Sequence, residues 1–193
     1  MSAALIVVAL VTVTGCATMN GQAALGRGLY DEAATQFARA LERDPDRVDA
    51  MVGLGIARYK LGSYADAAAI LDRAVTQAPK SDVARLYLAL SHVRQGKDAE
   101  AQEDLVTVGA LAPGTRLATQ VDHALRVLHE RERLTDTMRT FIAMSLESHV
   151  EMERQLFEAQ AAVRDAELRA SAHASPGPYF VRTPGGRVVP IFP

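Results

Sequence analysis

The chain has 193 residues, of which 49% are hydrophobic and only 5% aromatic, and its formal net charge is −2. This length fits one domain, and the low aromatic content fits alanine-rich helices better than a β-sandwich or barrel. Basic and acidic residues are interspersed, which argues against a nucleic-acid-binding face. Because Cys16 is the only cysteine, an internal disulfide and a cysteine-based metal cluster are excluded.

An apolar run occupies residues 3–13, and the segment Val13-Thr14-Gly15-Cys16 closes it. The run is too short to cross roughly 30 Å of hydrocarbon as a helix, but its length is typical of a signal-peptide core. The closing segment resembles the lipobox of bacterial lipoproteins, which implies a signal peptide at residues 1–15 and lipidation of Cys16. Met1-Ser2 carries no positive charge, so a buried N-terminal helix with an incidental cysteine is the alternative.

The residue after the cysteine sorts lipoproteins in Gram-negative bacteria, and Ala17 resembles the outer-membrane class. We therefore expect a protein of the cell envelope that is lipid-anchored in the outer membrane and faces the periplasm. Almost no linker follows Cys16, so the folded part should lie close to the membrane surface.

Five columns of residues recur with a period of 34 after this segment. They are Gly28, Ala33, Phe37, Ala40 and Pro45, then Gly62, Ala67, Leu71, Ala74 and Pro79, then Gly96, Ala101, Leu105, Val108 and Pro113. A left-handed glycine ends a first helix, the small and apolar residues form one stripe of a second helix, and proline stops that helix. The period predicts three helix-turn-helix units at about residues 17–46, 47–80 and 81–114.

This pattern resembles the tetratricopeptide repeat (TPR) family, most closely in the second unit, with Leu54-Gly55 and Gly62-Ser63-Tyr64. The resemblance implies an all-α, TPR-type α-solenoid that binds other proteins. Asn20 replaces the leucine of the family in the first unit, which predicts a short or frayed first helix. Asp98 replaces the tyrosine in the third unit, which predicts looser packing there.

The resemblance also implies a concave face, lined by the first helix of each unit, on which partners dock. The residues expected there are Val52, Ile56, Tyr59, Lys60, Leu86, Tyr87, Leu90, Val93 and Arg94. They would form an apolar floor with a basic edge. Ile56 and Leu90 stand where relatives that clamp acidic C-terminal peptides need polar residues, so that activity is not expected. Alternatively, a later helix of the same chain covers the floor, because an uncovered apolar patch of this size favours aggregation.

Residues 115–174 contain neither glycine nor proline and are rich in strong helix formers. A capping helix is predicted at 115–134, with an apolar side made of Leu117, Val121, Ala124, Leu125 and Leu128. A break follows near Leu134, where Thr135 or Asp136 can cap a new helix.

The new helix, at residues 135–174, carries apolar residues at heptad spacing. The helix-pairing residues are Met138, Ile142, His149, Met152, Leu156 and Val163. This stripe predicts a coiled coil with a second copy or with a partner helix, or else packing back against the repeats. Phe141 and Leu146 widen the stripe toward ordinary helix packing. His149 is interpreted as a register-setting or edge residue rather than as a metal ligand.

The tail at residues 175–193 is rich in proline and glycine. Residues 179–183 and 187–191 flank Pro184-Gly185-Gly186, which predicts a hairpin. An irregular tail is nevertheless the preferred interpretation, because a two-stranded ribbon has no face to bury and Pro190 confines its strand to an edge. Addition of a strand to a partner sheet is a third interpretation.

No sequence pattern indicates catalysis, a metal site or a cofactor. The five histidines include no pair at helical i, i+4 spacing, and no phosphate-binding loop or nucleophile elbow occurs. We expect no enzyme, no cofactor, no small-molecule substrate and no nucleic-acid partner. The sequence predicts a membrane-anchored adaptor or scaffold that binds an envelope protein of a pilus, secretion or outer-membrane assembly machine. A structural homo-oligomer held by the long helix is the alternative, and an enzyme ranks third.

Overall fold

The structure of the protein, a computed structural model, describes residues 17–130, 134–173, 179–182 and 185–191. It divides into two compact units, one extending to Ser148 and the other beginning at His149. This boundary falls inside the long helix that the sequence predicts at 135–174. The predicted signal peptide and the predicted lipidation site, Cys16, lie outside the described residues.

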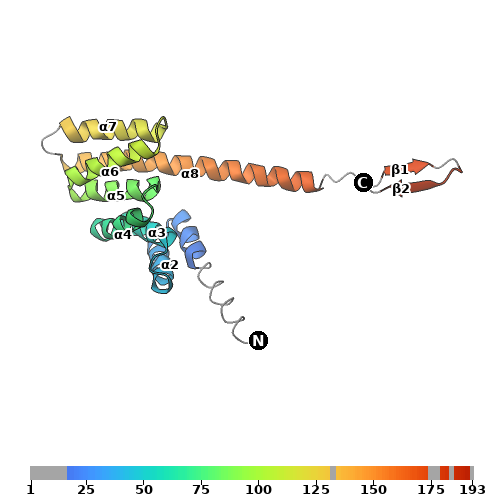
Figure 1. Ribbon diagram of the computed structural model, residues 1–193, viewed down its shortest axis with the longest axis horizontal. Helices are drawn as coiled ribbons and strands as arrows, with labels where there is room; N and C mark the ends of the chain where they lie inside the picture. Colours follow the sequence, from blue (N-terminus) through green and yellow to red (C-terminus); the bar gives the residue numbers. More distant parts are fainter. Residues whose placement is uncertain (1–16, 131–133, 174–178, 183–184, 192–193) are drawn as a thin grey trace. The chain divides into compact units, whose positions relative to one another are not determined.

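The first unit is a stack of helices in which each packs against the next along the chain (Figure 1). A helix at residues 17–26 precedes α2 (Tyr30–Arg43), α3 (Val48–Lys60), α4 (Tyr64–Gln77), α5 (Asp82–Gln95), α6 (Asp98–Leu111) and α7 (Arg116–Glu130). The last helix, α8 (Asp136–His173), begins in this unit. The prediction of helix-turn-helix units followed by a further helix and a long helix is therefore confirmed.

The turn inside each repeat depends on a left-handed glycine. Gly28, Gly62 and Gly96 have φ angles of 74°, 80° and 75°. A residue with a side chain is strained in this conformation, so glycine ends the first helix and lets the second begin within a few residues. The 34-residue glycine column is thus explained by backbone geometry.

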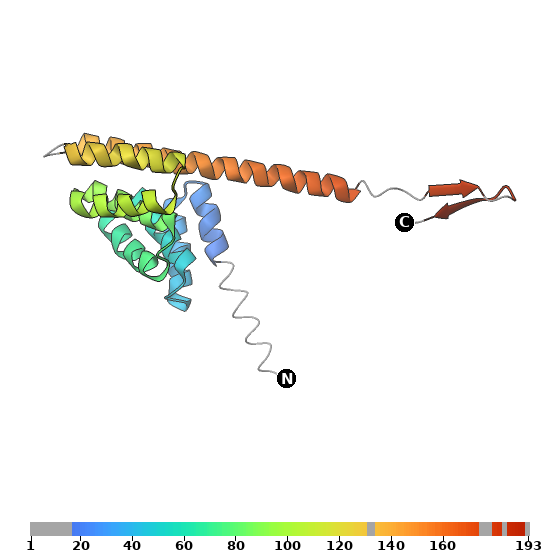
Figure 2. The ribbon, with the colours of Figure 1, turned by 45° about the horizontal axis from the view of Figure 1, so that its top comes forward.

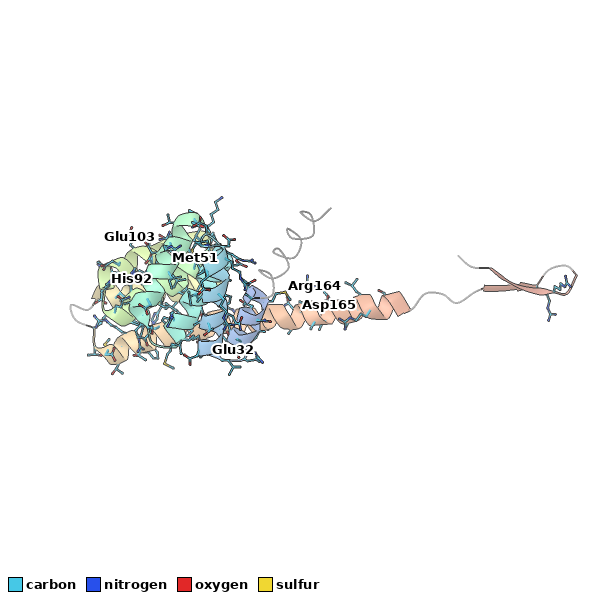
Figure 3. All side chains as sticks on the ribbon, turned by 90° about the horizontal axis from the view of Figure 1, so that it is seen from below. Glu32, Met51, His92, Glu103, Arg164 and Asp165 are labelled. Carbon is cyan, nitrogen blue, oxygen red and sulfur yellow. The ribbon has the colours of Figure 1, made fainter. Side chains whose placement is uncertain are left out.

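The other columns of the repeat form the core of the first unit. All their alanine, aromatic and aliphatic members are at most 1% exposed: Ala33, Phe37, Ala40, Ala67, Leu71, Ala74, Ala101, Leu105 and Val108. Met51, also fully buried, lies inside the helical stack in Figure 3. The stripe predicted from the period is therefore the buried side of each second helix.

Two glycines of α3 allow the helices of the first two repeats to approach closely. A Cβ atom added at Gly53 would lie within 3.0 Å of the Phe37 ring, and one added at Gly55 within 3.0 Å of the Leu71 side chain. Each glycine leaves space that the large side chain of a neighbouring helix fills. The Leu54-Gly55 pair of the repeat pattern has this steric role.

The first helix was predicted to be short or frayed, and the described residues show no fraying. It covers residues 17–26 without interruption, although the sequence pattern suggested fraying at Asn20. Asn20 is exposed, whereas Ala17 and Ala24 on the same helix are buried. The polar side chain therefore faces away from the core and does not disturb the packing of this helix.

The predicted break between the last two helices is present. The Thr135 hydroxyl accepts a hydrogen bond from the Met138 amide at 3.3 Å, so this residue caps the start of α8 as expected. On α7 the predicted apolar side is confirmed, because Leu117, Val121, Ala124 and Leu128 are buried and Leu125 is half-buried.

The second unit contains the remainder of α8 and a hairpin. Strands β1 (Tyr179–Arg182) and β2 (Val188–Ile191) pair antiparallel, with Tyr179 opposite Ile191 and Phe180 opposite Pro190. This arrangement matches the hairpin rather than the irregular tail. Among the described side chains of residues 149–193 none is buried, so the described part of this unit shows no hydrophobic core.

Candidate functional site

The predicted concave floor is mostly core. Of its nine residues, Tyr59, Leu86, Tyr87, Leu90 and Val93 are buried, and Val52, Ile56, Lys60 and Arg94 are half-buried. Leu86, Leu90 and Val93 are at most 1% exposed, so the prediction that they contact a partner is wrong. The physical reason is that α5 packs against α3, α4 and α6 at once, which leaves little of its surface free.

The tyrosines of this face form an internal aromatic cluster. The Tyr59 ring lies 5.5 Å from the rings of Tyr64 and Tyr87, centroid to centroid. Burial raises the pKa of the Tyr59 hydroxyl, with smaller contributions from neighbouring tyrosines. The Arg94 guanidinium lies 4.9 Å from the Tyr64 ring centroid, within range of a cation–π interaction. Tyr59 therefore stabilises the junction of two repeats and is not available as a docking residue.

The first turns of α8 contact the ends of the repeat helices. The Arg94 guanidinium donates a hydrogen bond to the Thr140 hydroxyl at 2.7 Å, and Arg139 donates to the Asp98 carboxylate at 2.7 and 3.2 Å. Lys60, the last residue of α3, forms an ion pair with Glu147. The alternative in which a later helix of the chain packs on the repeats is therefore correct for this part of α8.

Asp98 has a role that the repeat pattern did not reveal. It replaces the tyrosine of the family, and both of its carboxylate oxygens accept hydrogen bonds from Arg139. These bonds raise the pKa of the Arg139 guanidinium. Arg139 also donates to the Leu134 carbonyl at 2.7 Å, so a single side chain links α6, the α7–α8 connection and α8.

A second polar cluster joins the two helices of the third repeat. Asp104 is buried, and its carboxylate lies 3.0 Å from both the Arg85 guanidinium and His92 Nδ1. His92 is labelled in Figure 3. Because both carboxylate oxygens have partners, the cluster connects α5 to α6 in a third repeat that was expected to pack loosely. Arg85 and His92 lie about two turns apart on α5, and Asp104 lies on α6, so no local sequence spacing pointed to the cluster.

An apolar groove lies between α7 and the start of α8, which run alongside each other in Figure 2. Its volume is about 460 Å³. The lining residues are Gln120, His123, Ala124, Val127, Thr137, Met138, Phe141, Ile142, Ser145 and Leu146. Ala124, Ile142 and Leu146 are buried, whereas Phe141 is 71% exposed. The groove thus combines a covered apolar base with an accessible aromatic ring.

The predicted helix-pairing residues divide into two groups. Met138 is half-buried and Ile142 is 4% exposed, so both belong to the packed part of α8. Met152, Leu156 and Val163 are 52%, 55% and 58% exposed. The side chain of His149 lies outside the described residues. Pairing with another helix therefore stays a prediction for the stripe after residue 148, and it is wrong for Ile142, which the chain itself covers.

The described residues contain no group of three or more His, Cys, Asp or Glu side chains placed to hold a metal ion. Within the same ranges of the chain, no helix has the length and apolar content needed to cross a membrane.

Comparisons with known proteins agree with this architecture. Tetratricopeptide-repeat patterns match residues 18–82 and, overlapping them, residues 59–119. The chain therefore belongs to the tetratricopeptide repeat family, with the matched region covering the three predicted units. No curated protein shows a significant sequence match to this chain.

Several solved structures share the fold. One is the Yersinia enterocolitica type III secretion chaperone SycD, solved in complex with a peptide of the translocator YopD. It is 19% identical with a TM-score of 0.59, and the match covers 63% of this chain and 96% of that chain. The first TPR of Spaghetti (RPAP3), bound to an HSP90 peptide, is 20% identical with a TM-score of 0.56. The match covers 61% of this chain and 90% of that chain. A Thermobaculum terrenum O-GlcNAc transferase is 20% identical with a TM-score of 0.56. The match covers 72% of this chain and 26% of that chain. The same fold thus occurs in peptide complexes and within an enzyme.

Proposed function

We propose that this protein is a membrane-anchored adaptor of the bacterial cell envelope, which holds a partner protein through the groove between α7 and α8. Family membership supports a protein-binding role, since the similar SycD and RPAP3 domains were solved with peptides of other proteins. The lipobox-like segment ending at Cys16 supports the membrane anchor. We assign the partner to an envelope machine that assembles pili, secretion channels or outer-membrane proteins.

The observation that carries the binding site is the exposed ring of Phe141 beside the groove. Large exposed aromatic residues next to a formed apolar pocket are typical of interaction hot spots. The concave floor cannot serve in this way, because its central residues are in the core and its edge residues Lys60 and Arg94 contact α8. Of the exposed large hydrophobic residues of the first unit, Phe141 lines this groove, whereas the others, such as Val106 and Met144, do not.

The lining of the groove indicates the kind of segment it binds. Val127, Met138 and Phe141 provide apolar contacts, while Gln120 and His123 lie at the α7 side and can form hydrogen bonds. A partner segment with one or two large apolar side chains and a polar flank fits this chemistry. An acidic C-terminal peptide held by its carboxylate does not, since apolar side chains form most of the lining.

The binding site is tested by replacing Phe141 with glutamate. Affinity capture from detergent-solubilised envelopes should lose the wild-type partner with Phe141→Glu, because a charge at a hot spot is expected to weaken binding by at least about tenfold. Met144→Glu is the matched control: Met144 is 61% exposed on the same helix but does not line the groove. Equal capture by both variants and the wild type would show that the groove is not the site.

The anchor is tested separately at Cys16. Cells expressing the wild-type chain should incorporate a fatty-acid label into the protein, and the Cys16→Ser variant should incorporate none. Mass spectrometry that finds Met1 retained and the Cys16 thiol unmodified would refute the envelope location without bearing on the groove.

A further inference from the structure

The second unit carries an apolar stripe on α8 that its own described residues do not cover. Met152, Leu156 and Val163 recur at spacings of four and seven and are each more than half exposed. Ala159 and Ala166 lie on the same side of the helix, at the intervening heptad positions. Leu168 is also 67% exposed, but it lies nearly half a turn away, on the opposite side of the helix. The stripe is therefore a narrow seam of large and small residues.

The small residues produce a depression in this seam. A hollow of about 470 Å³ is lined by Leu156, Ala159, Gln160, Val163 and Arg164. Residues 156, 159, 160 and 163 have the spacing i, i+3, i+4, i+7, which is the set of four that receives one side chain of a facing helix in a coiled coil. The hollow thus has the form of an acceptor for a side chain of a second helix.

We propose that the occupant is α8 of a second copy of this chain, paired antiparallel along residues 149–170. In this register Leu156 enters the hollow beside Ala159 of the second copy, and Met152 packs against Val163 of the second copy. A large side chain then meets a small one at the centre, which fills the space to normal packing density. A parallel pair would place Ala159 against Ala159 and leave the hollow empty.

The charges beside the seam favour a second copy over a different chain. Of the positions that flank it, Gln155, Gln160 and Ala162 carry no charge, whereas Glu153, Glu167 and Arg169 are charged. In the antiparallel register Glu153 lies level with Ala162 and Glu167 with Ser148 of the second copy, so neither glutamate faces another charge. Two identical helices can therefore approach without like charges meeting, whereas a different coiled-coil partner is normally selected by charges at these positions. The pairing is independent of the groove between α7 and α8 and does not rest on the proposed adaptor function.

The test uses the full chain carrying Cys16→Ser, which has no other thiol. In sedimentation velocity at micromolar concentration, this chain should be a dimer. The Leu156→Glu, Val163→Glu double variant should weaken the dimer by at least about 100-fold, because it places charges in a desolvated seam. Leu168→Glu, at an exposed leucine outside the seam, should leave the dimer unchanged. A monomeric parent chain, or equal dissociation by both variants, overturns the proposal.

Disulfide formation tests the orientation. Copies carrying Leu156→Cys mixed with copies carrying Ala159→Cys should form covalent dimers on oxidation, because these positions face each other only in the antiparallel register. Each variant alone should cross-link far less than the mixture. Efficient cross-linking by Ala159→Cys alone would indicate a parallel pair and refute the proposed register.

Discussion

The two units of this protein use similar amphipathic helices with opposite outcomes. In the first unit the apolar columns that recur every 34 residues are at most 1% exposed, because each helix meets a neighbour of the same chain. In the second unit the stripe of α8 has the same helical periodicity, yet Met152, Leu156 and Val163 stay more than half exposed. The contrast shows that periodicity predicts which side of a helix is apolar, whereas its burial depends on the presence of a neighbouring element.

The difference in burial predicts that a leucine-to-glutamate substitution strongly destabilises the first unit and hardly affects the second. Leu90→Glu should destabilise the first unit by at least about 3 kcal/mol, because it buries an unpaired charge. Leu168→Glu should change the free energy of unfolding by no more than about 0.5 kcal/mol, since Leu168 is 67% exposed whereas Leu90 is 0% exposed. Urea denaturation followed by circular dichroism measures both. A folded Leu90→Glu variant with normal stability would contradict the assignment of this face to the core.

A glycine-to-alanine substitution in each unit tests whether the two units unfold together or separately. Gly62 and Gly186 both have a φ of 80° and no neighbouring atom within 4 Å of an added Cβ, so alanine costs each roughly 1–2 kcal/mol of backbone strain. At Gly62 the cost should lower the melting temperature of the repeats, because that turn joins two packed helices. At Gly186, in the turn of the hairpin, the melting temperature of the first unit should not change. Equal shifts for both variants would mean that the two units unfold together.

The smallest expected effect concerns the first turn of α8, which belongs to the first unit. Arg139→Gln should destabilise the first unit by about 1 kcal/mol, because it removes the paired hydrogen bonds to the partly exposed Asp98. A double-mutant cycle with Asp98→Asn should give a coupling energy of about 0.5–1 kcal/mol. Arg169→Gln, on the exposed part of the same helix, serves as the control and should have no measurable effect. Zero coupling would show that the first turns of α8 are not held by this pair.

The family and the core were predictable from residues alone. Glycine columns, small residues and prolines at a constant period each satisfy a local requirement, such as a left-handed turn or a close helix approach, and local requirements are visible in a sequence. The break at Thr135 was predictable for the same reason. The turn residues after residue 182 indicated the hairpin only as one of the alternatives, because nothing in the sequence shows a face that the ribbon buries. The steric role of Gly53 was not predictable, because it depends on the Phe37 ring of another helix.

The sites depended on contacts between distant segments. The concave floor has the composition of a docking surface, and its assignment failed because burial of Leu86 and Leu90 is a property of how α5 is surrounded. Likewise, the groove at Phe141 exists only because α7 and α8 lie alongside each other.

By itself the sequence determined the helices, their turns and the apolar side of each one, because these follow from backbone conformation and from side-chain spacing within a few residues. The tertiary structure alone decided which apolar sides became core and which stayed open. It placed Arg139 on Asp98 and Glu147 on Lys60, so that the first turns of α8 pack on the repeats and the following turns expose their stripe. Burial requires a second surface, and the position of that surface is not encoded within the helix that it covers.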